Sequence, residues 1–90
     1  MRIQKAKGIE LVGNNNLIKA LELAINDEWD ASHKIVQEMH SNHSNWIHAV
    51  LHKIEGDESN SRYWYAQTDH EYDEYQDPLD ELRAIQSELT

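Results

Sequence analysis

The stretch WIHAVLHKIEGD, residues 46–57, decides the fold because it contains a helix, the end of that helix and the start of the next. Its apolar side chains recur at the three- and four-residue spacing of an α-helix: Ile47, Val50, Leu51 and Ile54. Gly56 readily adopts the left-handed conformation that ends a helix, and Asp57 can cap the one that follows. The stretch therefore predicts a helix over residues 45–55, a tight turn, and a second helix over residues 58–68.

The preceding segment has the same design. A shift of about thirty residues aligns Leu17 with Ile47 and the pair Asn26-Asp27 with Gly56-Asp57. We expect a helix from about residue 16 to residue 25 and another, capped by Asp27, over residues 28–40. Residues 15–68 are therefore interpreted as two tandem helical hairpins. The hairpins must stack, because neither can bury its apolar face alone.

The remaining segments carry different signals. Residues 1–13 contain two glycines and scattered apolar side chains, so an irregular N-terminal arm is expected. Residues 69–77 are acidic without a helical period and predict an exposed connector, and the acidic run as far as Glu81 is interpreted as solvated. Asp77 followed by Pro78 is typical of a helix start and predicts a C-terminal helix over residues 78–89.

These segments together predict one all-α domain spanning residues 1–90. It consists of two tandem antiparallel helical hairpins plus a C-terminal helix, with a short irregular N-terminal arm. The layout resembles tetratricopeptide repeats by architectural analogy, although the repeat is shorter. The last helix is expected to cover an end of the stack that would otherwise be open.

Composition limits the possible functions. The chain has 90 residues, a net charge of −9 and no Cys. The negative charge argues against binding to nucleic acid or to an anionic membrane surface. Without Cys there is no disulfide and no thiolate ligand, so any metal site must use His and carboxylates. The chain shows neither a secretion signal nor a long apolar run, and we expect a cytoplasmic protein.

Parts of the chain resemble a known family. They are Glu28-Trp29-Asp30-Ala31-Ser32-His33, the stretch 46–57, and Asn60 with Tyr63-Trp64-Tyr65. They are similar to a group of small, mostly bacterial proteins of uncharacterised function. The pattern of that group is W-D-x-A-H, then W-I-H-A-x-L-H-R-x-E-G-D, then N-A-x-Y-W-Y. The resemblance covers residues 26–66, with Ser32, Ser61 and Lys53 in place of Ala, Ala and Arg. It implies no activity, but it singles out the same His and aromatic residues.

Polar side chains form a stripe beside the apolar face of the helix at residues 45–55. His48, His52 and Glu55 are spaced i, i+4 and i+7 and share one side of that helix. His33, on the inward stripe of the preceding helix, can approach them when the helices pack. Imidazoles and a carboxylate can bind Zn²⁺ or another divalent metal, so His48 and His52 form a candidate metal site. Alternatively, these His residues are boundary donors of hydrogen bonds to Asp30, Glu55 or backbone carbonyls.

Three aromatic residues follow one another at Tyr63, Trp64 and Tyr65. Consecutive helical residues point about 100° apart, so the three rings cannot share one face. Either Tyr63 packs into the hairpin core with the other rings under neighbouring segments, or the rings form a binding surface. Uncovered apolar area at Trp64 or on the last helix also suggests a weak homodimer.

Two functions are compatible with these features. The first is a small cytoplasmic interaction or small-ligand-binding module for an unidentified protein or small molecule. Its candidate site comprises six residues: His33, His48, His52, Glu55, Tyr63 and Trp64. The alternative is a metal-dependent hydrolase or related enzyme that uses His33, His48 and His52. The sequence identifies neither a catalytic residue nor a substrate.

Overall fold

The computed structural model describes the backbone of residues 2–90 and the side chains of residues 14–90. Within residues 2–90 the chain forms five α-helices, one short 3₁₀ helix and no strand. The elements are α1 (Arg2–Ile25), α2 (Trp29–Val36), α3 (Asn42–Glu55), α4 (Glu58–Tyr65), η1 (Tyr72–Glu74) and α5 (Pro78–Leu89). The predicted all-α class is confirmed. None of the described helices is both long enough and apolar enough to cross a membrane.

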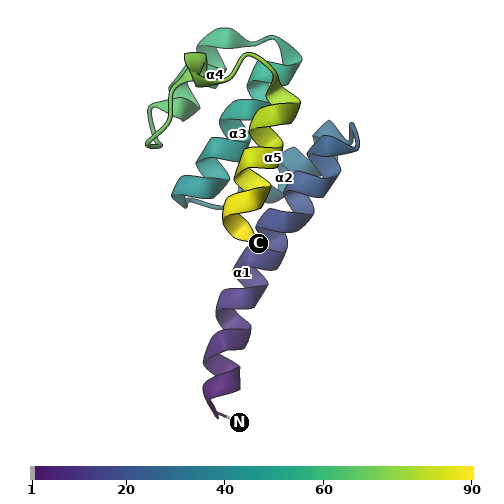
Figure 1. The fold of residues 1–90 in the computed structure, drawn as a ribbon, viewed down its shortest axis with the longest axis vertical. Helices are drawn as coiled ribbons and strands as arrows, with labels where there is room; N and C mark the ends of the chain where they lie inside the picture. The colour runs from purple at the N-terminus through teal and green to yellow at the C-terminus, as the bar shows by residue number, and fades with distance from the viewer. Residues whose placement is uncertain (1) are drawn as a thin grey trace.

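The helices form two hairpins and one covering helix (Figure 1). α1 packs against α2, and α3 packs against α4. α5 contacts both α1 and α3 and so joins the two hairpins. The largest fully buried apolar side chains between these helices are Trp46, Leu21, Ile47, Leu51, Leu82 and Ile85. Because Leu82 and Ile85 belong to α5, this helix completes the core.

α1 is longer than the sequence predicts. Residues 2–13, for which an irregular arm is expected, continue the helix through to Ile25. Single glycines such as Gly8 and Gly13 weaken a helix by about 1 kcal/mol each without ending it. Extending an existing helix adds one backbone hydrogen bond per residue and needs no new nucleus. The prediction was wrong because it treated these glycines as helix breakers. The N-terminal half of α1 extends beyond the other helices (Figure 1).

The helix ends follow local capping chemistry. Gly56 has a φ of 86°, and the Asp57 side chain accepts a hydrogen bond from the backbone N–H of Asn60. α3 begins earlier than predicted because Ser41 and Ser44 form a capping box. α2 and α4 end earlier than predicted, and i to i+3 hydrogen bonds tighten the turn that follows each of them.

Two buried serines define the repeat. The Ser32 hydroxyl donates to the carbonyl of Ala20, and the Ser61 hydroxyl donates to the carbonyl of Ala49, both at 2.7 Å. Each bond joins the second helix of a hairpin to the first. Ser32 and Ser61 are 29 positions apart, as are Ala20 and Ala49. The repeat length is therefore 29 residues, and the alignment at about thirty residues was wrong by one position.

This correction changes the interpretation of the first turn. Asp27, and not Asn26, is the counterpart of Gly56, and it has a positive φ of 67°. The N-cap of α2 is Glu28, whose side chain makes no capping hydrogen bond, and not Asp27 as predicted. A non-glycine residue thus holds the left-handed conformation that glycine holds in the second hairpin.

Substitutions at these two turns are expected to have different effects. Gly56→Ala should reduce the free energy of unfolding by about 1 kcal/mol, whereas Asp27→Gly should leave it unchanged or raise it slightly. An added Cβ at Gly56 meets no atom within 4 Å, so the cost arises from the positive φ. Asp27 already carries that strain. Urea unfolding of both variants measures the difference, and equal effects would contradict it.

Candidate functional site

Three histidines from two helices meet between the hairpins, and we call them the His cluster. His33 lies on α2, and His48 and His52 lie one turn apart on α3. The Nε2 atoms of His33 and His48 are 3.0 Å apart. One ring nitrogen from each histidine lies within 4.8 Å of those from the other two. His48 and His52 are 4% and 6% exposed and His33 is half-buried, so His33 is the member of the cluster most open to solvent.

Two tryptophans flank the His cluster. Trp29 of α2 stacks on His33 with ring centroids 4.7 Å apart, and its indole N–H donates to the Leu51 carbonyl at 2.6 Å. Trp64 of α4 stacks on His48 with ring centroids 3.9 Å apart. The indoles lie against the faces of two imidazoles and therefore restrict the planes of these rings.

His52 has a carboxylate partner. Its Nδ1 lies 2.5 Å from Oε1 of Glu55, one turn further along α3. Its Nε2 lies 3.5 Å from Nδ2 of Asn60 on α4. When Nδ1–H donates to a carboxylate, the lone pair is on Nε2, and metal-binding histidines are commonly oriented in this way. Nε2 is therefore the nitrogen of His52 that is available as a ligand.

His48 has no such partner. Its Nδ1 is buried and makes no hydrogen bond within the described part of the chain. Desolvation by burial, followed by the charges of His33 and His52, lowers the pKa of His48 to about 4. Burial and then His52 lower the pKa of His33, against the opposing effects of Glu55 and Asp30. Both imidazoles are therefore neutral at pH 7, the form that ligates a metal. The alternative interpretation was that these histidines donate hydrogen bonds to carboxylates or backbone carbonyls. It holds for His52 but is wrong for His48.

The six predicted site residues do not all lie together. The three histidines form the cluster, Glu55 hydrogen-bonds to His52, and Trp64 covers His48. Tyr63 is 59% exposed and contacts the edge of Trp64, with ring centroids 5.2 Å apart. The ring that packs into the core is that of Tyr65, and the expectation that it would be Tyr63 was wrong. Helix direction explains this result, because Tyr65 lies one turn after buried Ser61 and Tyr63 does not.

Two residues of the site were missed from the sequence. Trp29 lies one turn before His33 on α2, and this spacing is a signal that the two rings stack. Asn60 is the third residue after the cap Asp57, and its backbone N–H donates to the Asp57 side chain. The position of its side chain next to His52 depends on the packing of α4 against α3, for which the residues of α4 carry no local signal.

Asp57 also lies near His52. One ligand atom each from His52, Glu55 and Asp57 lies within 4.8 Å of the others. The two carboxylates are exposed, and Asp57 is already used as the cap of α4. We therefore interpret this group as one in which Glu55 orients His52 and Asp57 caps α4.

The His cluster has the donor set of a transition-metal site. Neutral imidazoles suit Zn²⁺, Cu²⁺ and related ions. A tetrahedral Zn²⁺ ion about 2.0–2.1 Å from each nitrogen would place ligand nitrogens about 3.3 Å apart. The 3.0 Å separation of His33 and His48 is close to this value, and His52 lies within 4.8 Å. Binding of one ion by all three nitrogens requires the wider separations, up to 4.8 Å, to close to this value.

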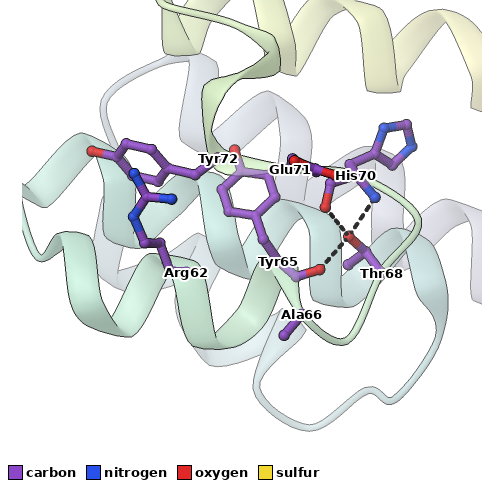
Figure 2. A pocket seen from close by; sticks show the side chains of 7 residues that line it. All are labelled: Arg62, Tyr65, Ala66, Thr68, His70, Glu71 and Tyr72. Atoms are coloured by element: carbon purple, nitrogen blue, oxygen red, sulfur yellow. Dashed lines mark hydrogen bonds between the residues drawn. The ribbon is translucent and has the colours of Figure 1, made fainter.

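A separate hollow of about 340 Å³ lies between α4 and the connector before α5 (Figure 2). It is lined by Arg62, Tyr65, Ala66, Thr68, His70, Glu71 and Tyr72. The Thr68 hydroxyl donates to the Tyr65 carbonyl at 2.8 Å and accepts from the backbone N–H of His70 at 2.9 Å. Arg62 lies over the Tyr72 ring and pairs with two carboxylates. These polar groups already have partners, and none of the lining residues belongs to the His cluster.

No protein-family model matches the chain, and no curated protein or solved structure is significantly similar to it. The function is therefore inferred from the geometry of the His cluster.

Proposed function

We propose that the protein is a small ligand-binding domain whose ligand is a divalent transition-metal ion, with Zn²⁺ as the best fit. His33, His48 and His52 are the ligands. The observation that carries this proposal is the convergence of three ring nitrogens within 4.8 Å of one another. The proposal joins the ligand-binding module and the metal site, which the sequence leaves as separate alternatives.

The surroundings of the three ligands support metal binding. Glu55 accepts the Nδ1–H of His52, which leaves Nε2 free and makes the imidazole a stronger ligand. Trp29 and Trp64 stack on the other two rings and hold their planes. Ligands that are held in orientation by hydrogen bonds and stacking from neighbouring side chains are typical of metal sites.

A contribution to the stability of the fold does not explain why a buried histidine occupies position 48. Its unpaired Nδ1 is expected to cost about 1–3 kcal/mol, and an apolar side chain of similar size would avoid that cost. A phenylalanine would also stack on Trp64, and a leucine would also bury apolar area. A ligand role for Nε2 gives a reason for an imidazole at this position.

The negative charge of the chain also favours the binding of a cation. The chain carries a net charge of −9, and the carboxylates of Glu55 and Asp30 act on His33. A negative field raises the local concentration of cations and opposes their release.

Calorimetric titration of the metal-free protein with Zn²⁺ tests the proposal. The native protein is expected to bind one Zn²⁺ ion, and free Zn²⁺ at 100 times Kd should raise the free energy of unfolding by about 2.7 kcal/mol. His33→Ala and His52→Ala should weaken binding by about 100-fold or more, since loss of a supporting residue alone costs 10- to 100-fold. Binding should also weaken in acid, because only neutral imidazoles ligate a metal ion.

His40→Ala is the matched control, because His40 is exposed and lies outside the His cluster. It should retain native affinity. Far-ultraviolet circular dichroism verifies that each variant is folded. Equal Zn²⁺ affinity in the native protein, His33→Ala and His40→Ala would refute the site.

A further inference from the structure

Asn60 lies at the edge of the His cluster, beside the free nitrogen of His52. Its side-chain Nδ2 is 3.5 Å from Nε2 of His52. Its backbone N–H, 3.3 Å from Oδ1 of Asp57, is held in the first turn of α4. The residue is partly buried, so its amide is restricted to the neighbourhood of the nitrogen that a metal would use.

The His cluster supplies three ligands. Among residues 14–90, the group of His and carboxylate side chains close enough to share this ion consists of His33, His48 and His52. Structural zinc sites use four protein ligands, whereas catalytic sites use three and leave the fourth position to water or substrate. The number of donors therefore indicates a site of the catalytic type.

We infer, on the basis of the metal binding proposed above, that the fourth position is open to water and that Asn60 donates a hydrogen bond to this water. In the metal-free protein the Asn60 amide faces Nε2 of His52. A metal ion takes the lone pair of that nitrogen, and the amide N–H then needs another acceptor. The oxygen at the fourth position is the acceptor that metal binding itself provides.

This arrangement favours hydrolysis. A metal ion lowers the pKa of a bound water to about 7 and supplies hydroxide at neutral pH. An N–H donor stabilises hydroxide more than water, because the hydrogen bond is stronger when its acceptor is charged. Asn60 thus acts on the attacking oxygen, and the histidines act through the metal.

The surroundings of the cluster select a neutral substrate. Trp29 and Trp64 provide apolar walls next to His33 and His48. The carboxylates of Asp30 and Glu55 place negative charge close to His33. These carboxylates offset the charge of a bound divalent ion, so the site has less attraction for an anionic phosphate ester than the metal alone would give, and a neutral carboxylic ester or amide needs no such attraction.

The neutral ester p-nitrophenyl acetate is a suitable probe. The oxygen of the water forms a bond to the carbonyl carbon, and the bond between that carbon and the p-nitrophenyl oxygen breaks. At pH 8 the products are acetate and p-nitrophenolate, and the two protons of the water pass to the buffer. The reaction needs no oxidant, reductant or further reactant.

Native protein, Asn60→Ala and Asn60→Asp, each loaded with Zn²⁺ or Co²⁺, test this inference. The visible spectrum of the native Co²⁺ form should change with pH around a midpoint near 7, as the bound water ionises. Asn60→Ala should raise this midpoint and reduce metal-dependent ester hydrolysis about tenfold, the effect of one hydrogen bond to a charged group. Its affinity for Zn²⁺ should be close to native. In Asn60→Asp a carboxylate should take the fourth position, which tightens Zn²⁺ binding and abolishes hydrolysis.

The outcomes separate this inference from the proposed function. A Co²⁺ spectrum that is independent of pH would overturn the open position. Native midpoint and native rate in Asn60→Ala would overturn the role of Asn60, with metal binding intact. Failure of the native protein to bind either metal in the calorimetric titration would refute the metal site and this inference with it.

Discussion

Replacing Glu81 by Ala is expected to lower the free energy of unfolding by about 3–5 kcal/mol. Glu81 lies on α5, is 0% exposed, and is surrounded by three donors. Trp46 Nε1 and Tyr65 OH donate to its Oε2 at 2.8 and 2.6 Å, and Lys53 Nζ lies 2.8 Å from its Oε1. Burial and the hydrogen bond to Glu81 raise the pKa of Tyr65, which keeps its hydroxyl as a donor.

The large loss of stability arises because buried charged and polar groups lose the carboxylate that they contact. Without the carboxylate, Lys53 keeps a charge in the interior without a counter-ion, and its remaining acceptors are the carbonyls of Tyr72 and Tyr75. Trp46 and Tyr65 also lose a buried acceptor, and each unsatisfied donor costs about 1–3 kcal/mol. The network ties α3, α4 and α5 together, so its loss destabilises the whole domain.

Urea unfolding at pH 7 measures this effect. Glu88→Ala is the matched control, since Glu88 lies on the same helix and its ion pair with His43 is exposed. That variant should lose less than about 1 kcal/mol. Glu81→Gln should lie between the two, because the amide keeps one acceptor oxygen. A loss in Glu81→Ala no greater than that in Glu88→Ala would contradict the network.

Acidification of the metal-free protein is expected to lower the free energy of unfolding by about 2–3 kcal/mol between pH 6.5 and 4.5, mainly through His48. Burial lowers the pKa of folded His48 to about 4, whereas an unfolded histidine titrates near 6.5. Between these values the unfolded chain binds more protons than the folded protein. Stability is therefore fully present above pH 6.5 and is lost as the pH falls. The pKa of His33 is lowered as well, and its contribution has the same sign.

Chemical unfolding at several pH values in the presence of a chelator checks this expectation. The range stops at about pH 4.5, because ordinary carboxylates titrate below it. His48→Gln removes the titrating group and should flatten the dependence, while the exposed residue in His40→Gln should leave it unchanged. A native protein equally stable at pH 6.5 and pH 4.5 would rule out a buried, neutral His48.

Local chemistry made part of this fold predictable. Gly56 ends α3, Asp57 caps α4, and Asp77 with Pro78 opens α5, because each of these effects acts within a single helical turn. The His48 and His52 stripe of the candidate site was predictable for the same reason, since the period of one helix sets it.

The acidic segment shows a feature that local sequence does not predict. Residues 69–77 are mostly exposed, as the charge pattern indicates, but Glu81 at the end of the same run is completely buried. Its interpretation as a solvated residue was wrong. The burial depends on Lys53, Trp46 and Tyr65, which lie 16 to 35 positions away in the chain. A carboxylate carries no sign in its own neighbourhood that distant donors will surround it.

The candidate site also combines features that depend on local sequence with features that depend on helix packing. The sequence alone was sufficient to predict the all-α class, the end of α3 and the start of α4. It was also sufficient to predict the face of α3 that carries two histidines. Each of these features depends on propensity, capping or helical period, which are local. The meeting of His33 with His48, the approach of Asn60 to His52 and the repeat of 29 residues required the packed helices. Shifting one helix by a single residue rotates every side chain by about 100°, so contacts between helices depend on the packing of the whole core.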